Sequence, residues 1–184
     1  MWSPDRRALL RLSAVMGLAA LTAGCFQPMY GDSKVVPSAG LDDRLATVDV
    51  VPIKTTKGTR LARVGVALRN DLIFALTGGG GEQTSNYQLT IQLSASQTQV
   101  IVDINSNRPD IQNYGINASY TLVDVTSGKT VVSGSTFSRV SYNIPGQQQR
   151  FAGDRGLRDA ENRASQVIAD NIRSRLASYF VAGT

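Results

Sequence analysis

The sequence contains no histidine and only one cysteine among its 184 residues. Without histidine the chain lacks the commonest general base and metal ligand. A single cysteine excludes an internal disulfide and makes an ordinary zinc site improbable. There is also no Gly-x-Ser-x-Gly pattern, the motif that surrounds the nucleophile of many hydrolases. We therefore predict that the protein is not an enzyme and that it needs no metal or cofactor.

The sequence also lacks an apolar run long enough to cross a bilayer as a helix. The apolar segment near the start, Leu12 to Ala23, is well short of the roughly 20 residues that a span requires. Arginines precede this segment, and small residues lead from it to Cys25. This three-part plan is typical of an export signal that is removed. We expect residues 1–24 to be a signal peptide and Cys25 to be the first residue of the mature chain.

The residues around the cysteine, Thr22-Ala23-Gly24-Cys25, resemble the lipobox of bacterial lipoproteins, although the usual leucine lies one position early, at Leu21. The resemblance implies a diacylglycerol thioether on the Cys25 sulfur and an acylated amino group. Several acyl chains on one residue would anchor it stably, whereas one chain holds only weakly. The alternative is a plain secretory signal followed by a buried thiol.

Removal of residues 1–24, which carry three Arg and one Asp, lowers the formal net charge from +5 to +3. This value is mildly basic and falls far short of the charge density of a nucleic-acid-binding domain. Export makes nucleic acid an unsuitable partner as well. An anionic lipid or glycolipid headgroup fits the charge better. Arginines make much of the surface of the predicted C-terminal helix basic outside its apolar stripe, and this surface is either a solvated face or a contact for anionic lipid or an acidic partner (Arg155, Arg158, Arg163, Arg173 and Arg175).

The mature chain divides into a tether and one domain. Residues 25–43 contain the lipidated N-terminus and a polar stretch with Pro37 and Gly40, which is typical of a linker. Residues 44–184 have the length of a single domain that can bury a core without disulfides.

Hydrophobic periodicity predicts the first half of this domain. Residues 45–53 form a Val-rich strand, and residues 59–77 form a helix with Thr59 as its cap and a glycine run after its end. Residues 86–96 alternate as a half-buried strand. The alternation resumes on the opposite parity after a bulge near 97–99, and a loop follows at 105–110.

The second half contains a hairpin and a long helix. Strands are predicted at 113–125 and 130–142, joined by a tight turn in which Gly128 suits a positive φ. A polar loop then leads to a helix over 154–180, whose apolar residues recur every three or four positions.

The element order is therefore β-α-β-β-β-α, an α/β (α+β) fold. A strand-helix-strand start favours parallel pairing of the first two strands, and hairpin connections make the later pairs antiparallel. We predict a two-layer sandwich in which two amphipathic helices cover one face of a mixed four-stranded sheet.

The start of the mature chain, Gly24-Cys25-Phe26-Gln27-Pro28-Met29-Tyr30-Gly31, resembles that of the lipopolysaccharide-assembly lipoprotein family LptE, with Met29 in place of leucine and without the glycine that commonly follows the cysteine. The order of elements is also similar. The resemblance implies a non-enzymatic lipoprotein on the periplasmic side of the outer membrane, which plugs an LptD-like β-barrel, helps it assemble and binds lipopolysaccharide.

The resemblance also suggests where such contacts would lie. Residues 83–119 are dense in Gln, Asn, Ser and Thr, as a plug in a polar lumen requires. By comparison with the family, Arg108 and Lys129 are candidate lipopolysaccharide-binding residues, because cationic side chains pair with phosphates. Both could instead be ordinary surface charges. The alternative function is an auxiliary lipoprotein of another envelope lipid transporter.

Overall fold

The computed structural model describes residues 40–79, 84–103, 108–144 and 150–183, with the backbone alone at 101–103, 108–110 and 150. All of them lie in one compact unit, Ser38–Thr184. The predicted signal, Cys25 and most of the tether lie outside the described residues. Within the described ranges, no helix combines the length and apolar character needed to cross a membrane.

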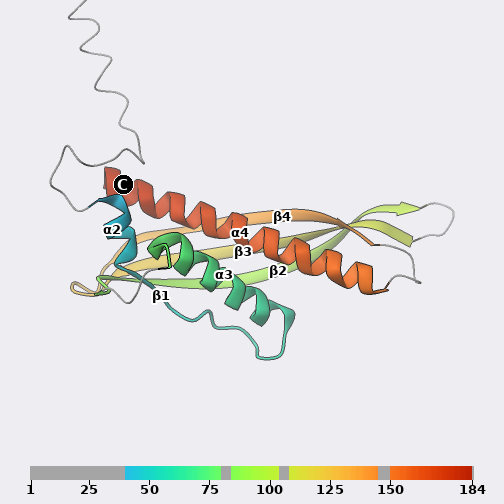
Figure 1. The fold of residues 1–184 in the computed structure, drawn as a ribbon, viewed down its shortest axis with the longest axis horizontal. Helices are drawn as coiled ribbons and strands as arrows, with labels where there is room; N and C mark the ends of the chain where they lie inside the picture. Colours follow the sequence, from blue (N-terminus) through green and yellow to red (C-terminus); the bar gives the residue numbers. More distant parts are fainter. Residues whose placement is uncertain (1–39, 80–83, 104–107, 145–149, 184) are drawn as a thin grey trace, which may run out of the picture. The chain divides into compact units, whose positions relative to one another are not determined.

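The described chain forms a mixed four-stranded sheet in the order β1-β2-β3-β4, with its helices on one face (Figure 1). Strand β1 (Val48–Val50) is short, whereas β2 (Tyr87–Asp103), β3 (Arg108–Asp124) and β4 (Thr130–Asn143) are long. The helices are α2 (Leu41–Ala46), α3 (Arg60–Thr77) and α4 (Arg150–Ala182). The predicted fold class is confirmed.

Helix α3 connects two parallel strands, as predicted. Its N-cap Thr59 accepts a hydrogen bond from the Ala62 N–H, and Gly78 ends the helix at a φ of 64°. Glycine adopts this left-handed backbone conformation without the steric cost that a Cβ atom would bring. The chain then returns so that Val48 to Val50 pair in parallel with Tyr87 to Leu89.

The three long strands pair antiparallel. The register between β2 and β3 shifts on either side of Ile101, slightly beyond the bulge predicted near 97–99. The β3–β4 turn is confirmed: Gly128 has a φ of 67°, and its N–H donates to the Asp124 carbonyl.

One face of the sheet carries the hydrophobic core. Alternate residues of β3, from Tyr114 to Leu122, are buried on the side of the helices, where α4 packs on β3 and β4 and α3 packs on β1 and β2. Each large side chain buried in this way contributes about 1.5–3 kcal/mol. The large apolar side chains of α3 and α4 that are fully buried are Val64, Leu68, Leu72, Ile168, Ile172 and Leu176.

The structure corrects several predicted boundaries. Residues 41–46, expected to be tether and strand, form helix α2, so the element order is α-β-α-β-β-β-α. Arg108, expected in a loop, is instead the first residue of β3 and pairs with Asp103. Helix α4 begins four residues early, at Arg150. These segments are short or polar, so contacts with neighbouring strands and helices decide their conformation more than local sequence does.

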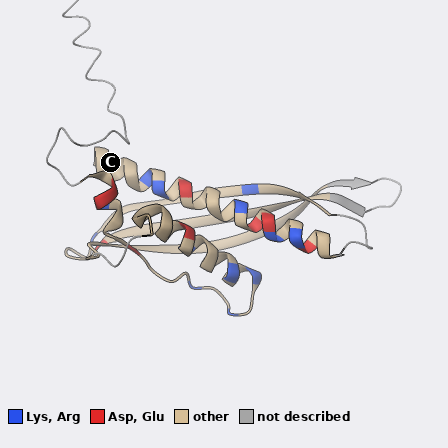
Figure 2. Ribbon diagram, viewed as in Figure 1, with Lys and Arg blue, Asp and Glu red and all other residues tan. Residues whose placement is uncertain are grey.

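Charged residues are concentrated on the helices, whereas the strands are almost free of them (Figure 2). Several arginines bond backbone carbonyls on neighbouring elements. Arg69 on α3 donates to the Val50 carbonyl at the end of β1, and Arg173 on α4 donates to the Ala75 carbonyl near the end of α3. Part of the predicted basic surface therefore has a structural role.

Candidate functional site

The face of the sheet opposite the helices is covered by uncharged hydrogen-bonding side chains. The strand register places these side chains in rows across β2, β3 and β4, such as Gln92–Ser119–Ser135 and Thr98–Asn113–Ser141. Most of these residues are exposed. Neighbours also bond one another, since the Ser141 hydroxyl donates to the Asn113 side-chain oxygen at 2.6 Å. We call this surface the open face.

A cation and an aromatic ring interrupt the open face on β4. Phe137 is 65% exposed, and the Arg139 guanidinium lies 5.9 Å from the centre of its ring. Both side chains point away from the core because they have the opposite parity to the buried residues of β4. The distance is at the outer limit of a cation–π contact, so the ring orients the guanidinium only weakly.

Gly115, the partner of Arg139 on β3, leaves space beneath the arginine. A Cβ at this position would lie 3.0 Å from the Ser96 hydroxyl oxygen and 3.7 Å from the Arg139 Cγ. In this row across three strands, Ser96 and Arg139 therefore flank a position that has no side chain, and the Arg139 stem lies beside it.

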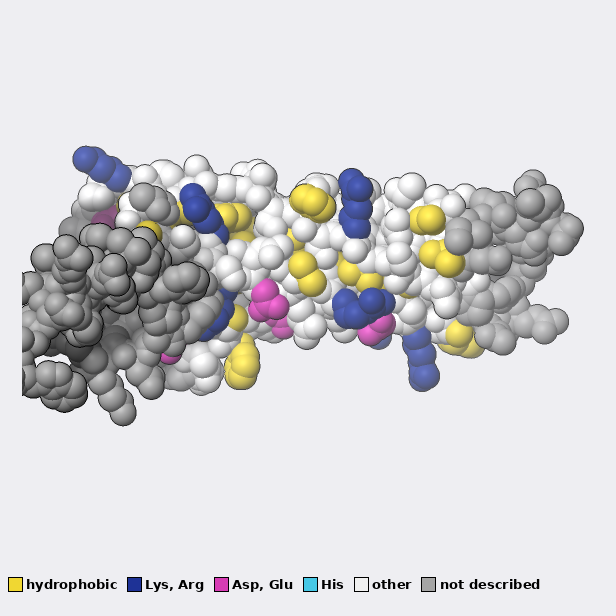
Figure 3. All heavy atoms as spheres, turned by 90° about the horizontal axis from the view of Figure 1, so that it is seen from above, with side chains coloured by type: hydrophobic (Ala, Val, Ile, Leu, Met, Phe, Trp, Pro, Cys, Tyr) yellow, Lys and Arg dark blue, Asp and Glu magenta, His cyan; other side chains and the backbone are white. Residues whose placement is uncertain are grey.

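No acidic residue balances this cation. Among the described outward positions of β2, β3 and β4 there is no Asp or Glu, and Arg139 forms no ion pair with any described residue. Because it carries a cation without an acidic partner among hydroxyl and amide groups, the open face can bind hydroxyl, amide and anionic groups. Figure 3 views the molecule from above relative to Figure 1, and there Lys and Arg side chains are scattered over a mostly polar surface with small groups of hydrophobic atoms between them.

Lys129 lies where it was predicted, in the exposed turn between β3 and β4. The turn is fixed by Asp124, whose carboxylate accepts a hydrogen bond from the Ser127 N–H at 2.8 Å. This backbone hydrogen bond lowers the pKa of Asp124 below its usual value, because it stabilises the charged form.

The structure does not bring Lys129 and Arg108 together. Arg108 begins the 17-residue strand β3, and Lys129 follows the far end of that strand. At about 3.3 Å per residue the two ends are roughly 50 Å apart, so one headgroup cannot contact both residues. The Arg108 side chain lies outside the described residues, and Cys25 does as well.

Arg139 is not among the site residues expected from the sequence. The available indication was the spacing of Phe137 and Arg139, two residues apart in a strand otherwise rich in Ser, Thr and Val. Such spacing places both side chains on one face. The contribution of Gly115 and Ser96 depends on strand register, which the sequence alone does not specify.

Comparisons with known proteins identified a matching family and solved structures of similar fold. A family model described as LptE, lipopolysaccharide-assembly, matches residues 45–176. A search of curated proteins gave no sequence match.

Among solved structures, the chain is similar to a lipoprotein from Caulobacter crescentus CB15, with 22% identity over 79% of this chain and 98% of that one, at a TM-score of 0.61. It is also similar to rare lipoprotein B from Shewanella oneidensis, with 14% identity over 73% and 96% of the two chains, at a TM-score of 0.51. Lipoprotein B from Nitrosomonas europaea has 11% identity over 75% and 90%, at a TM-score of 0.52. At these identities the similarity concerns the fold alone.

Proposed function

Because the chain belongs to the LptE family of lipopolysaccharide-assembly proteins, we propose that it is a non-enzymatic lipoprotein of the outer membrane. In this proposal acyl chains on Cys25 hold it at the periplasmic side. The domain plugs an LptD-like β-barrel, assists its assembly and binds lipopolysaccharide. The single observation that carries the proposal beyond family membership is the open face.

The open face supports a role inside a polar pore. Its rows of hydroxyl and amide groups can donate and accept hydrogen bonds along most of three strands. A lumen wall lined by polar side chains would satisfy such a surface, whereas a lipid bilayer would leave its polar groups unpaired.

The same face supports contact with a phosphorylated glycolipid. Arg139 has no acidic partner among the described residues, and a guanidinium binds phosphate through charge-assisted hydrogen bonds. Phe137 lies beside it with its ring exposed. We therefore propose Arg139 as a lipopolysaccharide contact on the open face, and Lys129 remains a separate candidate at one end of the sheet.

The barrel proposal is tested by photo-crosslinking in intact envelopes. A photoreactive residue replaces Ser119, at the centre of the open face, in the full chain. Gln166, an exposed residue on α4, is the matched position on the helix layer. We expect Ser119 to capture a large outer-membrane barrel protein. Capture of inner-membrane transporter subunits instead, or of no barrel from either position, would contradict the proposal.

The anchor is tested separately. Cys25→Ala should release the protein from the membrane fraction, because the substitution removes the only thiol that can be acylated. Ser33→Ala is the matched control and should leave fractionation unchanged. Unaltered membrane association of the Cys25 variant in the absence of the barrel would contradict the anchor.

A further inference from the structure

Two adjoining hollows lie at the start of α4, away from the open-face cation. The first has a volume of about 690 Å³ and is lined mainly by apolar side chains from the ends of β3, β4 and α4, among them Ile111, Tyr142 and Ile144. The second has a volume of about 450 Å³ and is lined by Phe151, Ala152, Asp154, Arg155 and Arg158. Ala152 lines both, so the two hollows adjoin at this residue.

The first hollow is suited to an apolar chain. Its tyrosine, Tyr142, is buried, and its hydroxyl already donates to the Gln112 side-chain oxygen at 2.7 Å. Tyr142 therefore offers its ring to the hollow and needs no further polar partner. Gly156 allows α4 to lie close to β4, because a Cβ there would be 3.4 Å from the Asn143 carbonyl oxygen. The volume is within the range of small-molecule pockets.

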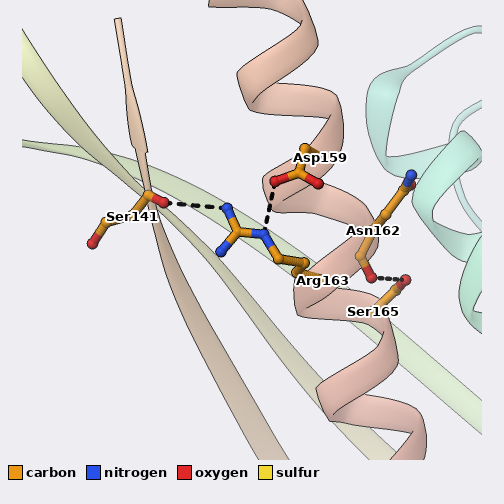
Figure 4. A network of polar contacts seen from close by, with 5 residues as sticks. All are labelled: Ser141, Asp159, Asn162, Arg163 and Ser165. Atoms are coloured by element: carbon orange, nitrogen blue, oxygen red, sulfur yellow. Dashed lines mark hydrogen bonds and ion pairs between the residues drawn. The ribbon is translucent and has the colours of Figure 1, made fainter.

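The two charged residues at the edge of this first hollow, Asp159 and Arg163, form an ion pair with each other. Arg163 extends from α4 and donates through Nε to the Asp159 carboxylate at 2.8 Å and through Nη2 to the Ser141 carbonyl at 3.4 Å. Figure 4 shows the guanidinium between these two partners, whereas Asn162 and Ser165 contact each other farther along the helix. The Arg163–Asp159 pair therefore adds no net charge at the edge.

The second hollow does carry net positive charge. Each acidic residue in the first half of α4 pairs with an arginine: Asp154 with Arg60, Asp159 with Arg163, and Glu161 with Arg63. Arg155 and Arg158 are exposed, and neither has an acidic partner among the described residues. Phe151 lies beside them and is 86% exposed.

We propose that these two hollows form one binding site for an anionic amphiphile. The acyl chain occupies the apolar hollow between α4 and the ends of β3 and β4. The anionic headgroup binds Arg155 and Arg158, and Phe151 contacts the first methylenes of the chain. Acyl glycolipids and anionic phospholipids share this chemistry. The site deepens the proposed function where the ligand is the glycolipid, but it does not depend on binding to a barrel.

The test uses the full chain in its own envelope. A small diazirine-bearing amino acid replaces Asn143, an exposed residue at the edge of the apolar hollow. Irradiation followed by mass spectrometry identifies any lipid attached to the protein. The same amino acid at Gln166, exposed on α4 but outside both hollows, measures background labelling.

We expect lipid adducts at Asn143 to exceed those at Gln166 by at least about tenfold, the ratio that 1.4 kcal/mol of preferential binding produces. The adduct's headgroup distinguishes a glycolipid from a phospholipid, and either supports the site. Arg155→Gln together with Arg158→Gln should lower the yield several-fold, and so should Ala152→Trp, which fills the hollow. The two glutamine substitutions are at exposed positions, so thermal unfolding should be unchanged.

Equal labelling at Asn143 and Gln166, adducts formed with protein alone, or a yield insensitive to the double glutamine variant would overturn the proposal. Recovery of the barrel on affinity capture is measured with the same diazirine-bearing chains, which carry no other substitution. If the barrel is captured but Asn143 gives no lipid adduct above the Gln166 background, this site alone is refuted. Lipid adducts at Asn143 without any captured barrel refute the plug function alone.

Discussion

Arg63 on α3 forms an ion pair with Glu161 on α4, and the glutamate side chain is only 1% exposed. Apart from this ion pair, neither carboxylate oxygen of Glu161 has a hydrogen-bond partner in the described part of the chain. The two helices lie side by side, because Ser165 on α4 also donates to the Asp71 carboxylate at 3.1 Å. The pair therefore links the two helices of the covering layer through a charge that is almost completely desolvated.

Removing the arginine should be strongly destabilising. Arg63→Met leaves the buried Glu161 charge without its ionic partner, and we expect a loss of about 3–5 kcal/mol in the free energy of unfolding. Urea unfolding followed by circular dichroism measures this loss. Arg158→Met, at an exposed site on α4, should change stability by less than about 0.5 kcal/mol. The double variant Arg63→Met, Glu161→Leu should recover much of the loss, and a larger loss in the double variant would contradict this explanation.

Gly134 allows a tyrosine to lie across β4. A Cβ at Gly134 would be 2.7 Å from the Tyr120 hydroxyl oxygen and 2.9 Å from its Cζ. Because Tyr120 is buried among core residues, it cannot move away without displacing them. We expect Gly134→Ala to cost about 1–3 kcal/mol, measured by thermal unfolding. Ser135→Ala, the exposed neighbour, is the control.

A second substitution separates this clash from a loss of chain flexibility. Tyr120→Phe removes the atom nearest to the added methyl group, so it should restore part of the stability of Gly134→Ala. If Gly134→Ala unfolds at the same temperature as the parent, the close approach of the tyrosine ring has no energetic consequence.

Asp124 should make stability depend on pH in acid. Its pKa is lowered in the folded state, chiefly by the hydrogen bond from the Ser127 N–H. The stabilisation is therefore fully present above the unfolded pKa, which is about 4, and is lost as the pH falls through the folded value. We expect Asp124→Asn to show a shallower fall in melting temperature below about pH 4. If the melting temperatures of the parent and of Asp124→Asn fall identically with pH, Asp124 makes no such contribution.

Arg139 should contribute to lipopolysaccharide binding through its charge. Arg139→Gln removes an unpaired guanidinium from the open face, and we expect affinity for purified lipopolysaccharide to fall about 3- to 10-fold, corresponding to roughly 1 kcal/mol at an exposed site. Arg175→Gln removes the same charge from the helix layer and is the matched control. The loss should diminish at high salt, because exposed charges are screened.

If both variants bind equally well, or if Lys129→Gln alone abolishes binding, the contact lies elsewhere and the proposed role of Arg139 is wrong. A fall caused by unfolding is excluded by circular dichroism of each variant.

The sequence by itself determined the elements whose side-chain pattern is long and regular. The period of α3 and the alternation in β2, β3 and β4 predicted these elements, their buried faces and the mixed sheet, since burial of one face requires that pattern. Gly78 and Gly128 located the end of α3 and the β3–β4 turn, because both backbone conformations favour glycine. These features depend on local chemistry, which a sequence records directly.

Only the tertiary structure decided which distant residues meet. Strand register placed Arg139 beside Gly115 and Ser96 and separated Arg108 from Lys129 by the length of β3. Helix packing brought Arg63 to Glu161 and left Arg155 and Arg158 without acidic partners among the described residues. Periodicity shows which face of an element is buried but not how far it is shifted along its neighbour. That shift depends on packing between segments far apart in the chain, and the candidate sites depend on the shift.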